Sequence, residues 1–101
     1  MQVLTLKEMV EYQDGSIVSK EIIKKEAGTV TLFAFDKGQG LSEHTAPFDA
    51  LVNMLEGQAE VTIAGKPSTV KEGEMIIMPA NKPHSVQATS RFKMLLVLIK
   101  K

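Results

Sequence analysis

The two histidines of the chain, His44 and His84, are the residues whose type and position best fit a functional site. His44 follows the glycine-rich stretch 38–43, and His84 follows the turn Pro79–Pro83. Each stands where a predicted loop enters a predicted strand, and rigid scaffolds commonly present functional groups at such junctions. Imidazoles bind divalent metals and transfer protons near neutral pH, so both histidines are candidates for metal ligands and for catalytic groups.

The elements that must position these histidines are predicted to be short strands. Turn signals rich in glycine and proline recur along the chain, and between them lie apolar or alternating runs: Ile17–Lys24, Thr29–Phe35, Asp49–Leu55, Gln58–Ile63, Met75–Met78, His84–Ala88 and Phe92–Ile99. Short strands at roughly 8–12-residue spacing favour a β-sandwich or barrel. Only the first dozen residues are ambiguous, since Leu6–Val10 fits either one helical turn or an opening strand.

Two of these runs, Thr29–Phe35 and Met94–Ile99, are apolar on both faces. A strand in a one-sided sheet alternates between apolar and polar residues, whereas a strand that is covered twice need not. We therefore expect a second layer of the same chain, or a second subunit, on the outer side of these strands.

Two stretches of the sequence resemble the paired motifs of the cupin family. Residues 38–57 resemble the first motif, G-x5-H-x-H-x3,4-E-x6-G, and residues 73–88 resemble the second, G-x5-P-x-G-x2-H-x3-N. Both glycine frames, Pro79 and two histidines match. The resemblance implies an all-β fold, the double-stranded β-helix or jelly-roll barrel of cupins, formed as a single domain over residues 1–101.

The metal-ligand set of the family is only half present. A full cupin site uses two histidines and a glutamate from the first motif and one histidine from the second. The resemblance places His44 and His84 at two of these positions, and Ala46 and Ala50 stand where the second histidine and the glutamate belong. Catalytic transition-metal sites normally keep at least three protein ligands. We therefore expect a divalent metal (Zn, Fe, Mn or Ni) to be weakly held or absent.

A neighbouring side chain is needed if a third ligand is to be recruited. Asp49 precedes the glutamate position, so in a regular strand it points to the opposite face, and a bulge after Pro47 would be needed to turn it inward. Glu43 and Gln39 precede His44, and we interpret both as solvated loop residues.

The two alanines also remove bulk and charge from the predicted barrel mouth. The expected ligand pocket has apolar walls and two imidazoles, and its residues are Ala46, Ala50, Val52, Met54, Met78 and Val86. Such a pocket suits an apolar or aromatic small molecule held by one or two polar contacts.

Composition excludes several other functions. Lys+Arg and Asp+Glu both number 12, and Arg91 is the only arginine, so no nucleic-acid partner is expected. Cysteine is absent, which removes disulfides and thiolate chemistry. The longest apolar run, Met94–Ile99, is far shorter than the roughly 20 residues of a membrane helix, and the N-terminus does not resemble a secretory signal. We expect a cytoplasmic protein without a membrane partner.

Three functional hypotheses follow. The first is a cupin barrel that binds a small molecule, with His44 and His84 holding a divalent metal or acting as paired hydrogen-bonding and proton-transfer groups. The second is a metal-dependent enzyme of dioxygenase or isomerase type with a recruited third ligand. The third is a non-catalytic dimerisation module with a packed interior. A homodimer is expected under each of them.

Overall fold

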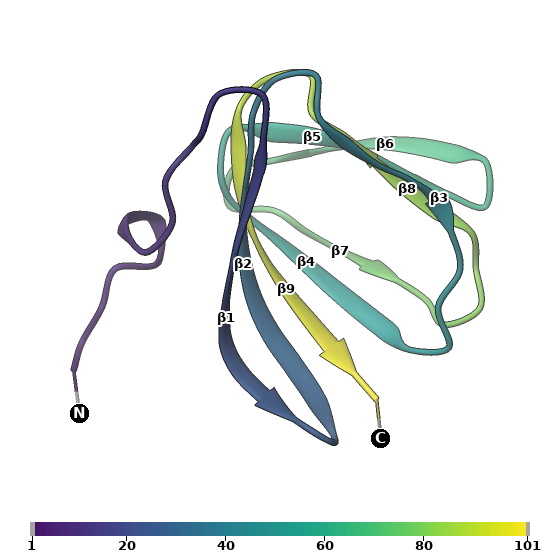
Figure 1. Ribbon diagram of the computed structural model, residues 1–101. Helices are drawn as coiled ribbons and strands as arrows, with labels where there is room; N and C mark the ends of the chain where they lie inside the picture. Colours follow the sequence, from purple (N-terminus) through teal and green to yellow (C-terminus); the bar gives the residue numbers. More distant parts are fainter. Residues whose placement is uncertain (1, 101) are drawn as a thin grey trace.

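Two antiparallel sheets face each other and diverge toward one end, as the computed structural model of residues 2–100 shows (Figure 1). The first sheet has the order β1 (Ile17–Lys25), β2 (Gly28–Phe35), β9 (Phe92–Ile99), β4 (Asp49–Glu56) and β7 (Met75–Met78). The second has the order β3 (Gly40–His44), β8 (His84–Gln87), β5 (Gln58–Ile63) and β6 (Lys66–Lys71). This arrangement confirms the predicted all-β jelly-roll fold. Met1 and Lys101, the ends of the predicted domain, lie outside the described residues.

The seven runs predicted as strands are all present, with ends shifted by at most one residue, and the sequence did not predict β3 or β6. The edge strand β6 contains Pro67, whose missing N–H is tolerated at a sheet edge. Strand β3 begins at Gly40, where a Cβ atom would lie 2.6 Å from the carbonyl oxygen of Val86. Glycine at this position therefore allows β3 to pair closely with β8.

The apolar core fills the space between the sheets at the end where they converge. The rings of Phe35 and Phe92 stack there with centroids 4.5 Å apart, and both side chains are fully buried. On β4 the residues Ala50, Val52 and Met54 are buried in alternation with more exposed neighbours, as expected when one face of a strand meets a core.

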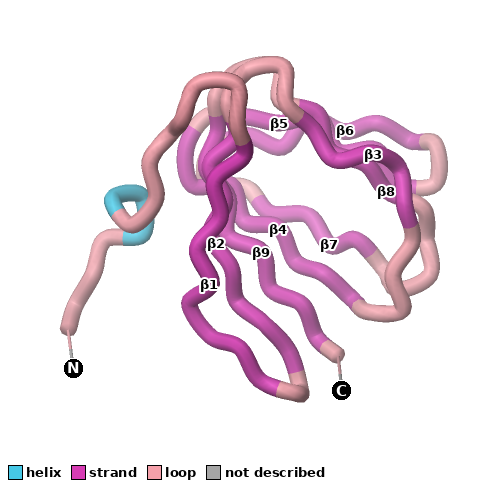
Figure 2. Tube along the Cα trace, in the orientation of Figure 1, coloured by secondary structure: helices cyan, strands magenta, loops and turns pink. Residues whose placement is uncertain are grey.

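The segment 6–16, called here the N-terminal strap, crosses the outer face of the five-stranded sheet before β1 begins (Figure 2). It opens with a 3-10 helix, η1 (Leu6–Glu8), which matches the helical alternative for this region. Val10 of the strap is buried against Leu32 and Ala34 of β2. The strap thus supplies the second apolar cover for one part of β2.

Polar contacts fix the strap to the barrel. Arg91 donates from Nε to Asp36 at 2.7 Å and from an amino group to Asp14 at 2.6 Å. The hydrogen bond from Arg91, with further bonds from backbone N–H groups, lowers the pKa of Asp36 to about 2. Tyr12 donates its hydroxyl to Glu56 at 2.5 Å. Burial raises the pKa of the Tyr12 phenol. The hydrogen bond to Glu56 and the negative charge of Glu56 raise it further.

Beyond the strap, a row of apolar residues runs across the outer face of the five-stranded sheet. The strand register aligns one residue from each strand, and we call this set the outer row: Ile23, Val30, Val97, Leu51 and Ile77. Ile23 and Ile77 are about half exposed, at 48% and 52%. Val30, Leu51 and Val97 are partly exposed, and none of the five belongs to the apolar cluster under the strap, so the strap does not cover the outer row.

Candidate functional site

His44 and His84 meet directly across two neighbouring strands, and we call them the His pair. They are partners in the antiparallel register of β3 and β8, which places their side chains on the same face. Their Nε2 atoms lie 3.1 Å apart, and their rings meet edge to face with centroids 4.3 Å apart. His84 is buried and His44 is exposed, so the pair reaches from the barrel interior to its rim.

Each ring is held by the backbone two residues before it. The Nδ1 atom of His44 lies 2.7 Å from the carbonyl oxygen of Ser42, and that of His84 lies 3.1 Å from the carbonyl oxygen of Lys82. A carbonyl oxygen only accepts hydrogen bonds, so each Nδ1 carries the proton. The two Nε2 atoms, 3.1 Å apart, can share one added proton in a hydrogen bond, and without it each can accept a hydrogen bond from a bound molecule.

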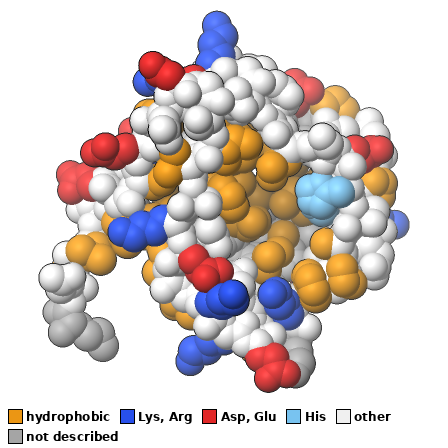
Figure 3. All heavy atoms as spheres, viewed as in Figure 1, with side chains coloured by type: hydrophobic (Ala, Val, Ile, Leu, Met, Phe, Trp, Pro, Cys, Tyr) orange, Lys and Arg blue, Asp and Glu red, His pale blue; other side chains and the backbone are white. Residues whose placement is uncertain are grey.

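An apolar cavity of about 220 Å³ opens beside the His pair. Figure 3 shows it as a hollow walled by hydrophobic side chains, with histidine at its edge. The lining residues come from both sheets and the β3–β4 loop: Leu41, His44, Ala46, Phe48, Ala50, Met78, His84, Val86, Met94, Leu96 and Leu98. Apart from the two imidazoles, every lining side chain is apolar.

Four of the six residues predicted for the pocket line this cavity, namely Ala46, Ala50, Met78 and Val86. Val52 and Met54 do not, and the prediction is corrected for both. They share the inward face of β4 with Ala50 but are fully buried deeper between the sheets, where the core closes over them.

The remaining apolar lining residues were not predicted from the sequence. Three of them, Met94, Leu96 and Leu98, alternate along β9 and are paired with inward-facing residues of β4. The period-two pattern of β9 could have identified this face, but both faces of the strand are apolar and so conceal it. Phe48 lies in the loop before β4, and no pattern pointed to it.

Asp49 does not join the His pair. Its Oδ1 atom accepts a hydrogen bond from the backbone N–H of Ala80 at 2.8 Å, and it lies on the face of β4 opposite to Ala50. The inward turn that a third ligand required is therefore absent at Asp49. Glu43 is exposed beside His44 and, like Gln39, does not line the cavity.

The residues at the site fit a bound metal ion only in part. The Nε2 separation of 3.1 Å suits two ligands of one ion, since metal–nitrogen bonds of about 2.0–2.1 Å would subtend about 100°. Within residues 2–100, however, no group of three His, Cys, Asp or Glu side chains is placed to hold a metal. Two imidazoles are one ligand short of a catalytic zinc site, so this set does not fit a resident catalytic metal.

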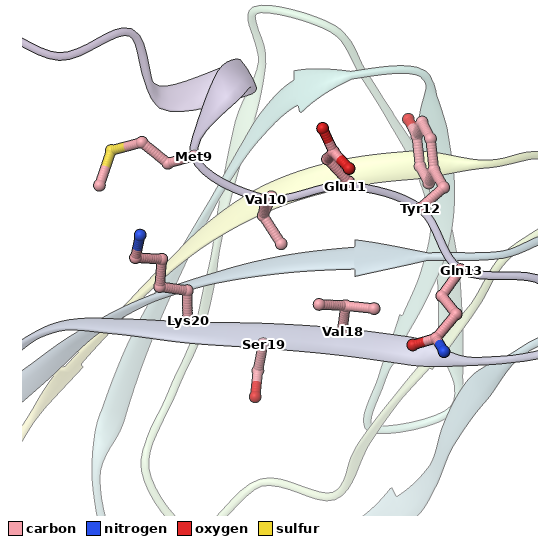
Figure 4. A pocket seen from close by; sticks show the side chains of 8 residues that line it. All are labelled: Met9, Val10, Glu11, Tyr12, Gln13, Val18, Ser19 and Lys20. Carbon is pink, nitrogen blue, oxygen red and sulfur yellow. The ribbon is translucent and has the colours of Figure 1, made fainter.

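A larger hollow of about 490 Å³ lies between the strap and β1, and Figure 4 shows the side chains around it. Val10 and Val18 point toward each other across it, while Ser19 points away. Its lining mixes apolar and charged residues and brings no pair of reactive groups together. The apolar cavity beside the His pair, which we call the mouth cavity, is therefore the better candidate site.

Two sheets connected in this order, with an imidazole pair at the open end, define a small β-barrel of the double-stranded β-helix class. Its two histidines come from the two segments in which the sequence resembles the cupin motifs. The chain belongs to the cupin family, because residues 31–99 match the family model described as a cupin domain.

Solved structures support this membership. A Streptococcus pyogenes protein of unknown function is 38% identical, with a TM-score of 0.95 over 99% of this chain and 88% of that chain. A cupin 2 conserved barrel domain protein from Leptotrichia buccalis is 48% identical, with a TM-score of 0.93 over 96% of this chain. The match covers 47% of the Leptotrichia chain, so the present chain spans about half its length.

A more distant cupin superfamily protein from Desulfitobacterium hafniense is 25% identical, with a TM-score of 0.94 over 99% of this chain and 92% of that chain. Among proteins with curated annotation, none matches this chain. Across residues 2–100, no helix has the length and apolar character needed to cross a membrane.

Proposed function

We propose that this cupin binds a small, largely apolar molecule in the mouth cavity, with the polar group of that molecule against the His pair. The observation that carries the proposal is the combination of an apolar space of about 220 Å³ with two imidazoles at its edge. Ligand sites are typically apolar pockets in which a few polar groups set the orientation. Here the His pair supplies those polar groups.

The His pair acts in this proposal as a hydrogen-bonding unit. Both rings are oriented by backbone carbonyl groups, so their Nε2 atoms are held in place before a ligand arrives. Ordering two free imidazoles on binding would cost side-chain entropy, and rings that are already fixed avoid that cost. A divalent metal would find two nitrogen ligands here and would be held weakly.

Replacing the two histidines tests the proposal. A fragment library is first examined by ligand-observed NMR against the wild-type protein. For the fragments that bind, we expect the double variant His44→Ala, His84→Ala to lose at least tenfold in affinity while its circular dichroism is unchanged. Ser85→Ala is the matched control, since Ser85 follows His84 on the strand and so faces the opposite side. Unchanged binding by the double variant would refute the proposal.

The metal content of the purified protein separates this function from the enzymatic alternative. We expect well below one equivalent of Zn, Fe, Mn or Ni in protein prepared without chelators. Near-stoichiometric metal would favour a metal-dependent enzyme of dioxygenase or isomerase type. Such an enzyme would need a third ligand from outside the described arrangement, because Asp49 is engaged with Ala80.

We also propose that two copies of the chain associate through the outer row. Five apolar residues in register across five strands form a continuous surface, and the strap leaves it uncovered. Stable interfaces bury about 800 Å² on each partner, and we expect the proposed dimer to bury a similar area. Sedimentation at micromolar concentration should give a dimer, and Val97→Lys should give a folded monomer. A wild-type monomer would contradict this proposal.

A further inference from the structure

The mouth cavity has a positively charged residue, Lys100, at its rim. Within residues 2–100, no Lys, Arg, Asp or Glu side chain lies on its walls. The cavity walls are formed by apolar side chains and the His pair. Lys100 lies outside the walls, with its Nζ atom 5.6 Å from the ring centroid of Phe48, which is itself a lining residue. An ammonium group over an aromatic ring is attracted to it, so Phe48 holds Lys100 beside the opening.

The strand pattern explains why Lys100 lies at the opening. Leu96 and Leu98 face the cavity from β9. Side chains alternate along an extended chain, so Lys100 continues the same face one step beyond the end of β9. Its backbone N–H donates to the carbonyl oxygen of Ala27 at 2.7 Å, which keeps the chain extended to that point.

Two carboxylates near the opening, those of Asp49 and Glu43, do not face the cavity. Asp49 lies on the outer face of β4 and accepts from the Ala80 N–H. Glu43 is exposed and lines no part of the cavity. On β1, Glu21 and Lys24 face the inner side, but β1 is two strands away from β9 and their charges are opposite. Among the charged side chains of residues 2–100, Lys100 is the one whose charged group contacts a lining side chain, the Phe48 ring.

The size of the cavity limits the ligand. An apolar cavity of about 150 Å³ in another protein accommodates benzene. The 220 Å³ available here is enough for one ring or branched chain with one small substituent. Typical drug-sized pockets begin at about 300 Å³, so larger molecules are excluded unless part of them stays outside.

We propose that the ligand is a small aromatic or branched acid with one ionisable oxygen group, and that Lys100 is a specificity-determining residue for it. This inference rests on the proposed function. The apolar body of the acid lies against Ala50, Met78 and Leu98, and its oxygen lies at the His pair. A protonated Nε2 donates to an oxyanion and a bare Nε2 accepts from O–H, so either form of the acid is bound there. Lys100 then selects the anion from outside.

Three nearly isosteric probes test the charge preference: benzoate (−1), benzamide (neutral) and benzamidine (+1). Their dissociation constants are measured by NMR titration of the methionine and alanine methyl groups that line the cavity. For ligands of nine heavy atoms we expect benzoate to bind in the range of about 0.1–1 mM. Benzamide should bind at least fivefold more weakly, and benzamidine should show no saturable binding.

Charge variants of Lys100 test its role separately. Lys100→Gln should weaken benzoate binding about fivefold, the size expected of an attraction between partly exposed charges, and leave benzamide unchanged. Lys100→Arg should restore benzoate binding, and Lys37→Gln, a change in the turn at the opposite end of β2, should have no effect. The preference for benzoate should shrink with added salt, since the Debye length is about 10 Å at 0.1 M.

The outcomes distinguish this inference from the function on which it rests. If benzamide binds as well as benzoate, and Lys100→Gln changes nothing, but the double histidine variant loses binding, the acid preference is wrong and the binding site stands. If no probe or fragment binds, or the double histidine variant binds like the wild type, the proposed function and the inference both fail.

Discussion

The substitution Ala50→Leu tests whether the mouth cavity is a true void. Ala50 is 4% exposed and its side chain faces the cavity from β4, between Leu98 of β9 and Met78 of β7. Leucine adds three carbon atoms. If each takes a volume similar to the 30 Å³ share of a water molecule, they fill about 90 Å³ of the 220 Å³ available.

The expected change in stability follows from that volume. Burying three carbon atoms stabilises by up to about 2.4 kcal/mol at about 0.8 kcal/mol each, and imperfect fit and lost rotamer freedom reduce the gain. We expect the free energy of unfolding to rise by between zero and about 2 kcal/mol. Any ligand of the cavity should bind at least tenfold more weakly, because the added side chain occupies its place.

Ala59→Leu is the matched control. Ala59 is fully buried in the core, opposite Val70 of β6, and does not line the cavity. Adding three carbon atoms to a packed interior typically destabilises by about 1–3 kcal/mol. Each kcal/mol shifts the Tm of a domain of this size by about 4–8 °C, so thermal unfolding will separate the two variants clearly.

The result that would refute the reasoning is a loss of stability in Ala50→Leu as large as that in Ala59→Leu. The space beside the His pair would then be packed in solution. The hypothesis of a dimerisation module with a filled interior would become the better description of the chain.

Three further predictions concern the strap and the backbone. Tyr12→Phe removes the hydrogen bond to Glu56 and should lower the free energy of unfolding by about 1 kcal/mol, measured by urea denaturation, whereas an unchanged midpoint would show that this bond contributes nothing. The pKa of Asp36 is lowered from 3.8 to about 2, so its contribution to stability is complete above pH 4 and is lost as the pH falls toward 2. The fluorescence of Tyr12, the only tyrosine in a chain without tryptophan, should report release of the strap in that window, and Asp36→Asn should remove the transition. Gly57→Ala places a Cβ atom 2.3 Å from the carbonyl oxygen of Arg91, at a residue with a backbone φ of 75°. We expect the free energy of unfolding to fall by more than about 3 kcal/mol, or the chain not to fold. Near-native stability would mean that the β4–β5 turn can rearrange.

Turn signals and apolar runs were sufficient to predict most strands, because most of the runs are bounded by glycine or proline and the strands are short. They failed at β6, because proline is typical of turns and Pro67 nevertheless lies within an edge strand. They failed again at β3, which begins at Gly40 directly after a glycine-containing turn and so resembles a loop. In both places the strand exists because a neighbouring strand pairs with it, and that contact is made by residues distant in the sequence.

The sequence indicated where in the fold the candidate site would lie. It did not indicate how far each residue would lie from the opening of the cavity. The matched motifs identified His44 and His84, and β3–β8 pairing brings their Nε2 atoms within 3.1 Å. The alternation of side chains along β4 correctly predicted that Val52 and Met54 face the barrel interior. It could not predict their distance from the opening of the cavity, because alternation does not show where along the strand the second sheet packs against it.

The attachment of both imidazoles to the backbone has a consequence for how this barrel can change over time. Each ring takes its orientation from a carbonyl oxygen two residues upstream, at Ser42 and Lys82, and any amino acid at those positions provides the same oxygen. Mutations in the cavity walls can therefore alter which molecule fits without disturbing the rings. Within this scaffold, recognition of new compounds can be acquired by varying wall residues while the polar end of the site stays constant.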